Sequence, residues 1–256
     1  MRTYEVQLLV SGAIATRSNI KFDTEKELNV GDSFRSDIDI RSHTSGVLIF
    51  STVYTVDRDR AYKVALLFIS QMLDVLSVRI NLPINVGLGE SQTAVRNIVK
   101  AVVDADEFKD SFATARWMNL RENKLLRAFS WYRKGLYTVD PFDKFLAFWN
   151  SISVVADGYC NDNERTRLGV VNRIWDCFIT IWGPVENWNF INGDDRWINI
   201  NNDIRNKIAH GGVTVDIRYI DDVLDRLDSV QVVAYLFLRE WAARLQIRIG
   251  DVDVFN

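Results

Sequence analysis

Cysteine and histidine are scarce in this sequence, which limits the metal and redox chemistry available to it. The 256 residues contain two cysteines, Cys160 and Cys177, and two histidines, His43 and His210. The cysteines do not form a C-x-x-C pair, so the spacing of a four-ligand zinc site is missing. We therefore expect no metal and no cofactor, and a reducing, cytoplasmic setting.

The sequence also has no excess of positive charge and no long apolar run. Its formal net charge is −3 and its pI is about 5.5, so it is not a bulk nucleic-acid binder of the basic kind, and any such contact needs a local patch. No apolar run reaches the roughly 18 residues of a membrane span. Residues 1–5 lead directly into a strand-like pattern, so we expect neither a secretory signal nor a membrane partner.

Alternating apolar residues indicate strands in the first hundred residues. Val6, Leu8 and Val10 occupy alternate positions, and residues 46–56 are rich in β-branched and aromatic side chains, both typical of strands. Shorter candidate elements are two strands at residues 18–22 and 37–41, a turn at residues 29–32, and an edge strand at residues 79–86 that contains Pro83.

The apolar period changes to three and four residues over residues 57–77. This spacing indicates an amphipathic helix. We interpret residues 1–103 as an α+β unit, a small, mostly antiparallel sheet with one long helix against it.

The second half, residues 104–256, is helical in pattern and carries all eight tryptophans after residue 116. Asp140 and Pro141 form a helix start, with an N-cap followed by proline at the first helical position. Helices are expected at residues 121–136, 142–156, 167–182, 196–210 and 215–247. Short connections between long helices predict an antiparallel bundle, and the whole chain belongs to the α+β class.

Residues 202–212 read as the last turns of a helix with a sharp stop. Ile204 and Ile208 are four residues apart and are expected to share one buried stripe. Gly211 and Gly212 supply the backbone freedom that ends a helix.

Three polar side chains in this helix end form a candidate catalytic set. Arg205 offers a planar fork that matches phosphate, and His210 exchanges a proton near neutral pH. Asn206 lies four residues before the histidine and faces it on a helix. The same residues also fit a plain structural role, because cations in the last turn stabilise a helix.

The order Arg-Asn-x-x-Ala-His-Gly resembles the signature of the HEPN superfamily. Residues 125–158 are similar to the ApeA-like and MauJ-like HEPN group, with an aromatic-rich helix, an Asp-Pro break and Phe-Leu-Ala-Phe-Trp-x-x-Ile. The resemblance covers roughly residues 120–248. It implies a metal-independent ribonuclease of a defence or toxin system that works as a homodimer with two motifs across a shared cleft.

One position departs from that group. Its members often carry a glutamate on the second helix, facing the arginine and the histidine. Ser153 corresponds to that position here, with Asn150 one turn before it, and we expect Ser153 to point inward. Lys207, Arg121 and Lys124 are candidate RNA contacts, with a solvated helix face as the alternative for the basic stretch.

A catalytically silent HEPN module is the rival hypothesis. Such a module dimerises or binds a small-molecule ligand or an unidentified protein partner, with residues 1–100 providing recognition. The environment of Arg205 and His210 distinguishes the two hypotheses: the residues either line an open, polar cleft or are buried by Trp197 and its neighbours.

Three other candidate sites are interpreted as structural. Residues 86–91 lack the lysine of a P-loop, residues 192–195 are interpreted as a solvated loop, and His43 is interpreted as a turn residue.

Overall fold

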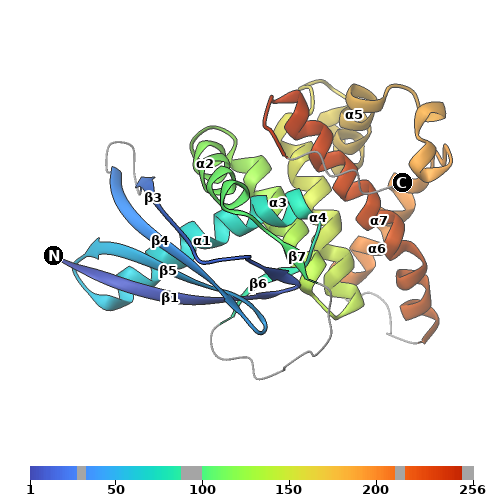
Figure 1. Ribbon diagram of the computed structural model, residues 1–256. Helices are drawn as coiled ribbons and strands as arrows, with labels where there is room; N and C mark the ends of the chain where they lie inside the picture. The colour runs from blue at the N-terminus through green and yellow to red at the C-terminus, as the bar shows by residue number, and fades with distance from the viewer. Residues whose placement is uncertain (28–32, 88–99, 211–216, 250–256) are drawn as a thin grey trace. The chain divides into compact units, whose positions relative to one another are not determined.

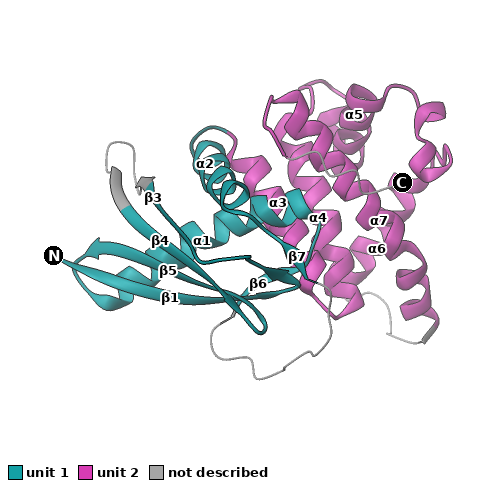
Figure 2. Ribbon diagram, in the orientation of Figure 1, with its two compact units in different colours: residues 1–121, 250–256 teal, residues 122–249 magenta. Residues whose placement is uncertain are grey.

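A computed structural model describes residues 1–27, 33–87, 100–210 and 217–249. The chain forms two compact units, residues 1–121 and residues 122–249 (Figure 2). The turn predicted at residues 29–32 and the segment 88–91 of the rejected P-loop lie outside the described residues. Each unit is described by itself.

The first unit is built on a five-stranded antiparallel sheet (Figure 1). Its strand order is β3-β4-β5-β1-β6, which makes β6 the edge strand beside β1. The bounds are β1 (Arg2–Gly12), β3 (Ile20–Glu27), β4 (Ser33–His43), β5 (Gly46–Thr55) and β6 (Ile84–Gly87). Two short strands, β2 (Ile14–Ala15) and β7 (Ala101–Val102), pair in parallel.

Helix α1 (Arg58–Ile80) supplies the other half of the core of this unit. Asp57 caps it, because the carboxylate accepts a 2.7 Å hydrogen bond from the backbone N–H of Arg60. Apolar residues from β1, β4 and β5 are buried together with the apolar side chains of α1, such as Ile69 and Met72. The predicted α+β unit, an antiparallel sheet with a long helix, is confirmed.

Helix α1 is also the one described helix that is long and apolar enough to cross a membrane. Its most apolar 18-residue window has a mean hydropathy of 1.5, and 67% of that window is buried inside the protein. The core helix of a soluble domain has the same composition, because it is apolar on every side that contacts a neighbour. This helix is therefore weak evidence for a membrane span.

The sequence interpretation missed helix α2 (Ala105–Arg121), which belongs to the first unit. Its buried face includes Phe108 and Phe112, and Phe112 meets the ring of Phe22 from β3 edge-on at 5.8 Å. The compact units consequently divide after Arg121 and not at residue 103. The edge strand expected at residues 79–86 is shorter than predicted, since α1 continues to Ile80 and β6 begins at Ile84.

The second unit is a bundle of five helices, as the sequence predicts for an antiparallel all-α half (Figure 1). Its bounds are α3 (Asn123–Tyr137), α4 (Pro141–Tyr159), α5 (Val170–Trp182), α6 (Trp197–His210) and α7 (Ile217–Arg244). Three short 3-10 turns connect them, η1 (Thr166–Leu168), η2 (Val185–Asn187) and η3 (Asn189–Ile191). Helix α4 packs against all four other helices.

The start of α4 follows the sequence signal closely. The carboxylate of Asp140 accepts a 2.9 Å hydrogen bond from the N–H of Asp143, and Pro141 occupies the first turn. Around α4 the core is aromatic, and the ring of Phe178 contacts that of Trp188 at 5.3 Å and that of Phe237 at 5.0 Å. The tryptophans at helical spacing are thus mainly core residues.

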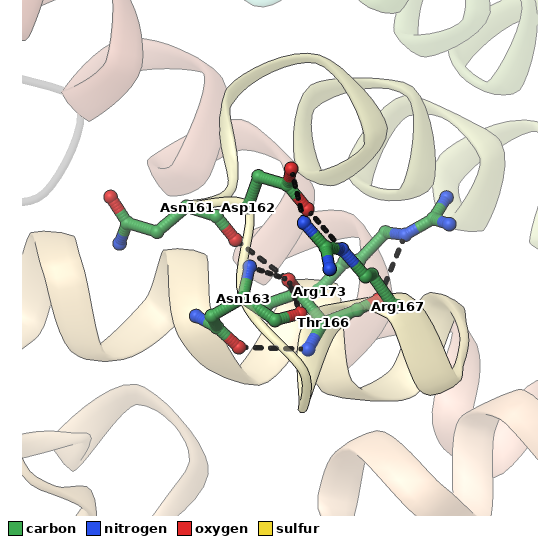
Figure 3. A network of polar contacts seen from close by, with 6 residues as sticks. All are labelled: Asn161, Asp162, Asn163, Thr166, Arg167 and Arg173. Carbon is green, nitrogen blue, oxygen red and sulfur yellow. Dashed lines mark hydrogen bonds and ion pairs between the residues drawn. The ribbon is translucent and has the colours of Figure 1, made fainter.

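A polar network holds the connection between α4 and α5 (Figure 3). Asn163 and Thr166 cap each other, each side chain accepting a 3.0 Å hydrogen bond from the other's backbone N–H. Arg167 donates a 2.8 Å hydrogen bond to each carboxylate oxygen of Asp162, and Arg173 donates to the carbonyl oxygen of Thr166. Each of the six residues drawn in Figure 3 takes part in at least one hydrogen bond within this network, so we interpret it as structural.

Candidate functional site

The candidate catalytic residues lie on the last two turns of α6. Trp197 anchors the start of this helix, because its side chain is 3% exposed and its Nε1 donates a 2.9 Å hydrogen bond to the hydroxyl of Ser229 on α7. Ile204 is buried, as predicted, whereas Ile208 is only half-buried. The buried stripe therefore ends at Ile204, six residues before His210.

Arg205 is half-buried and is held by its neighbour in the chain. Its Nη1 donates a 3.0 Å hydrogen bond to the Oδ1 atom of Asn206. No ion pair between Arg205 and a carboxylate is recorded in the described part of the chain. The guanidinium keeps most of its five N–H donors for another anion.

His210 is exposed at the end of α6. The sequence pairs Asn206 with His210, but the hydrogen bond recorded for the Asn206 amide oxygen in the described residues comes from Arg205. The physical reason is that a guanidinium is the stronger donor. Trp197 is at the opposite end of α6, so it does not bury His210.

The arginine and the histidine do not converge within one chain. Residues five apart on an ideal helix point about 140° from each other, and α6 stays helical as far as His210. Convergence needs an unwound helix end, which the sequence assigns to Gly211 and Gly212. These two glycines lie outside the described residues.

Ser153 and Asn150 lie at the wrong end of α4 to support Arg205. Trp149 of α4 packs against Trp197, the first residue of α6, with ring centroids 5.9 Å apart. Arg205 is eight residues further along α6, about 12 Å at 1.5 Å per residue. The two helices run antiparallel, so Asn150 and Ser153 extend away from Arg205.

Two further contacts fix this direction. Phe142, near the N-terminus of α4, stacks on Tyr219 at 5.6 Å, and the hydroxyl of Tyr219 donates a 3.4 Å hydrogen bond to the carbonyl oxygen of Ile204. The Ser153 hydroxyl, which is half-buried, donates to the carbonyl oxygen of Trp149 at 3.0 Å. The expectation that Asn150 and Ser153 support Arg205 was therefore wrong. The end of α4 that reaches the Arg205 level carries Asp140 and Asp143.

A groove of about 420 Å³ lies between α6 and α7, on a different side of α6 from Arg205. Lys207 and Asp203 line it from α6, and Asp222, Asp225 and Arg226 line it from α7. Tyr219 also borders the groove, and burial raises the pKa of its hydroxyl, with the charge of Asp222 acting in the same direction. The sequence interpretation missed this groove, although Asp222 and Arg226 share one face of α7 at a spacing of four residues.

The three expected RNA contacts are on three different helices. Lys207 is exposed in the groove just described, Arg121 is the exposed last residue of α2, and Lys124 is exposed in the first turn of α3. Arg121 and Lys124 belong to different compact units. They are therefore not treated as one surface.

No group of three or more histidine, cysteine or acidic residues suited to a metal ion occurs among the described residues. Cys177 is buried, and burial raises the pKa of its thiol, as it does less strongly for Cys160. Neither thiol is activated as a nucleophile, because nucleophilic cysteines have lowered pKa values.

Comparisons of the chain with models of protein families, with curated proteins and with solved structures found no match. The similarity to HEPN proteins therefore rests on the residues quoted from the sequence. The bundle and the position of the Arg205 segment at a helix end suit that resemblance without deciding it.

Proposed function

We propose that this protein is a metal-independent endoribonuclease of the HEPN type, with Arg205 and His210 as its catalytic pair. One observation carries the proposal. A half-buried arginine without a carboxylate partner in the described residues lies on the same helix end as an exposed histidine. A guanidinium without a carboxylate partner keeps N–H donors available for an anion such as phosphate.

The proposed reaction uses the 2′-hydroxyl of RNA as the nucleophile. The 2′-oxygen attacks the adjacent phosphorus, the bond from phosphorus to the 5′-oxygen breaks, and a 2′,3′-cyclic phosphate forms. His210 accepts the proton of the 2′-hydroxyl as the 2′-oxygen attacks, and the resulting imidazolium then donates this proton to the leaving 5′-oxygen. Arg205 stabilises the negative charge that develops on the non-bridging oxygens, and Asn206 keeps the guanidinium in place.

The proposal includes a homodimer, because Arg205 and His210 of one chain point away from each other on α6. A two-fold interface brings residue i of one copy to residue j of the other. It then combines Arg205 of one copy with His210 of the second. Light scattering at micromolar concentration tests this point, with twice the chain mass of 29.5 kDa as the expected result.

Cleavage of labelled RNA in EDTA tests the chemistry. We expect 2′,3′-cyclic phosphate ends without added metal, and no cutting of DNA, which lacks the 2′-hydroxyl. His210→Ala should lower the rate by about 10²- to 10⁴-fold with little change in melting temperature. Arg205→Lys keeps the charge and removes the two-point grip on phosphate, so it should also lose most activity. Activity that needs magnesium, or folded variants that cut like wild type, would reject the proposal.

A catalytically silent binding module is the second candidate, and two observations favour it. Ser153 gives no charge and lies far from Arg205, and the groove between α6 and α7 is lined by three carboxylates and two cations rather than by Arg205. Such a module binds RNA or a partner without turnover. A dimer that binds RNA and leaves it intact under the conditions above would establish this alternative.

A further inference from the structure

Helix α3 is strongly basic in an acidic chain. Between Asn123 and Tyr137 it carries Lys124, Arg127, Arg133 and Lys134 and no acidic residue, whereas the net charge of the chain is −3. Arg133 is buried at 8% exposure, and the other three cations are exposed. The positive charge is thus concentrated on the outer surface of one helix.

The three exposed cations share one face with a tryptophan. Lys124, Arg127, Trp131 and Lys134 follow at spacings of three, four and three residues, which align on one helix face. Arg127 and Lys134 each lie 5.2 Å from the centre of the Trp131 ring. We call these four residues the α3 stripe.

Among the described residues, no carboxylate forms an ion pair with the cations of the α3 stripe. In the described part of the chain no ion pair is recorded for Lys124, Arg127 or Lys134. Lys124 makes one long hydrogen bond of 3.4 Å to the carbonyl oxygen of Asp157. By contrast, Lys63 and Lys109 on the first unit are each paired with an aspartate on their own helix. An unpaired row of cations attracts polyanions.

We propose that the α3 stripe is a docking surface for single-stranded RNA. Lys124, Arg127 and Lys134 contact phosphates, and one base stacks on the indole of Trp131. From Lys124 to Lys134 the stripe covers eleven residues, about 15 Å along the helix axis. The stacking base replaces one of the two cations at the indole, and the released cation binds a phosphate, so no favourable charge contact is lost.

RNA suits this face better than an anionic membrane does. The exposed residues of α3 are polar, charged or aromatic: Asn123, Lys124, Arg127, Lys134 and Tyr137. Membrane-surface helices need a wide aliphatic or aromatic face to insert among the lipids, and no exposed aliphatic residue occurs on α3. Alternation of cations with an aromatic ring is instead the usual arrangement for single strands.

The inference rests on the proposed function only for the choice of RNA as the polyanion. Binding and cleavage are therefore measured separately. Fluorescence anisotropy with a labelled single-stranded RNA, using the His210→Ala protein in EDTA, reports docking without turnover. Three phosphate contacts predict that the logarithm of the binding constant falls with the logarithm of the salt concentration at a slope of about −2.

A charge-reversed protein tests whether RNA binding depends on the α3 stripe or on the net charge of the protein. Lys124→Glu/Arg127→Glu/Lys134→Glu should bind RNA at least tenfold more weakly and lose most of the salt slope. The matched control, Arg58→Glu/Lys63→Glu/Lys109→Glu, makes the same change in net charge on exposed cations of the first unit and should keep most of the affinity. Trp131→Ala should weaken binding by about 5- to 150-fold, the range for one lost stacking partner. Circular dichroism verifies that each variant is folded.

Three outcomes would overturn the inference: equal loss in the charge-reversed protein and its control, unchanged binding by folded Trp131→Ala, or co-sedimentation with phosphatidylserine vesicles without RNA binding. The proposed function fails on different evidence. If the stripe binds RNA and wild-type protein does not cut it, the docking proposal is supported and the proposed ribonuclease activity is rejected. If wild-type and charge-reversed proteins cut RNA equally well, the proposed ribonuclease activity is supported and the docking role of the α3 stripe is rejected.

Discussion

Among the described glycines of the bundle, Gly135 leaves the least room for an added methyl group. It lies on α3 where this helix crosses α4, and a Cβ atom built there would be 2.6 Å from two ring carbons of Phe148. Phe148 is fully buried and also contacts Tyr132 at 5.3 Å, so the ring has no free space to move into. Gly135→Ala therefore forces a shift of packed rings.

Two opposing effects determine the size of the change. Alanine favours a helix interior over glycine by about 1 kcal/mol, whereas overpacking a tight core costs about 1–3 kcal/mol. Because two ring carbons are so close, we expect the cost at the upper end, and Gly135→Ala should lower the free energy of unfolding by about 2 kcal/mol. Gly158→Ala is the matched control, since its Cβ would meet the flexible side chain of Lys124. It should be neutral or stabilising by up to about 1 kcal/mol.

Urea denaturation followed by tryptophan fluorescence measures both variants. Seven of the eight tryptophans belong to the second unit, so the signal reports on the bundle. A Gly135→Ala protein as stable as wild type would show that α3 and α4 are further apart than the ring contact implies. Destabilisation by Gly158→Ala of the same size would show that helix position, and not the clash, determines the effect.

Three further predictions concern individual side chains. Ser153→Ala should change neither RNA cleavage nor the free energy of unfolding beyond about 0.5 kcal/mol, because its hydroxyl bonds only to its own helix; assays of both quantities check this. Ser229→Ala removes the acceptor of the buried Trp197 Nε1–H and should cost about 1–3 kcal/mol in urea denaturation, with Ser229→Thr as the milder control. The hydrogen bond from Arg41 holds the pKa of the Asp39 carboxyl below its usual value of 3.8, against the effect of burial. The stability from this lowered pKa is present above about pH 4 and is lost as the pH falls through the folded-state pKa, so Asp39→Asn should lack that acid-dependent loss in a pH series of circular-dichroism melts.

Local signals in the sequence predicted the elements that they specify directly. Asp140 and Pro141 define a helix start by themselves, and the alternating residues of β1 and β5 define strands, so these elements are confirmed. Helix α2 was missed although Phe108, Phe112 and Ala115 repeat at helical spacing. Its polar face is long, and its apolar face packs against α1 and β3. The sequence pattern of α2 alone does not show that these two elements lie beside it.

The candidate site was predicted in part for a related reason. A single helix end fixes which residues are near one another along α6, so Arg205, Asn206 and His210 were found together. The supporting residue on α4 depends on the direction in which two helices pass each other, and a pattern within one helix does not contain that direction. Ser153, which is half-buried, therefore lies toward the end of α4 that runs away from Arg205.

The angle between Arg205 and His210 makes the composite site testable by mixing two inactive chains. If each site takes its arginine from one copy and its histidine from the other, a heterodimer of Arg205→Ala and His210→Ala chains contains one intact site and one doubly defective site. Equal mixing gives heterodimers in about half of the assemblies, so about a quarter of wild-type activity should return. A site within one chain stays defective in every copy, and mixing restores nothing. Purified single variants, each measured alone, give the baseline, and restored activity that does not depend on the mixing ratio would contradict the shared site.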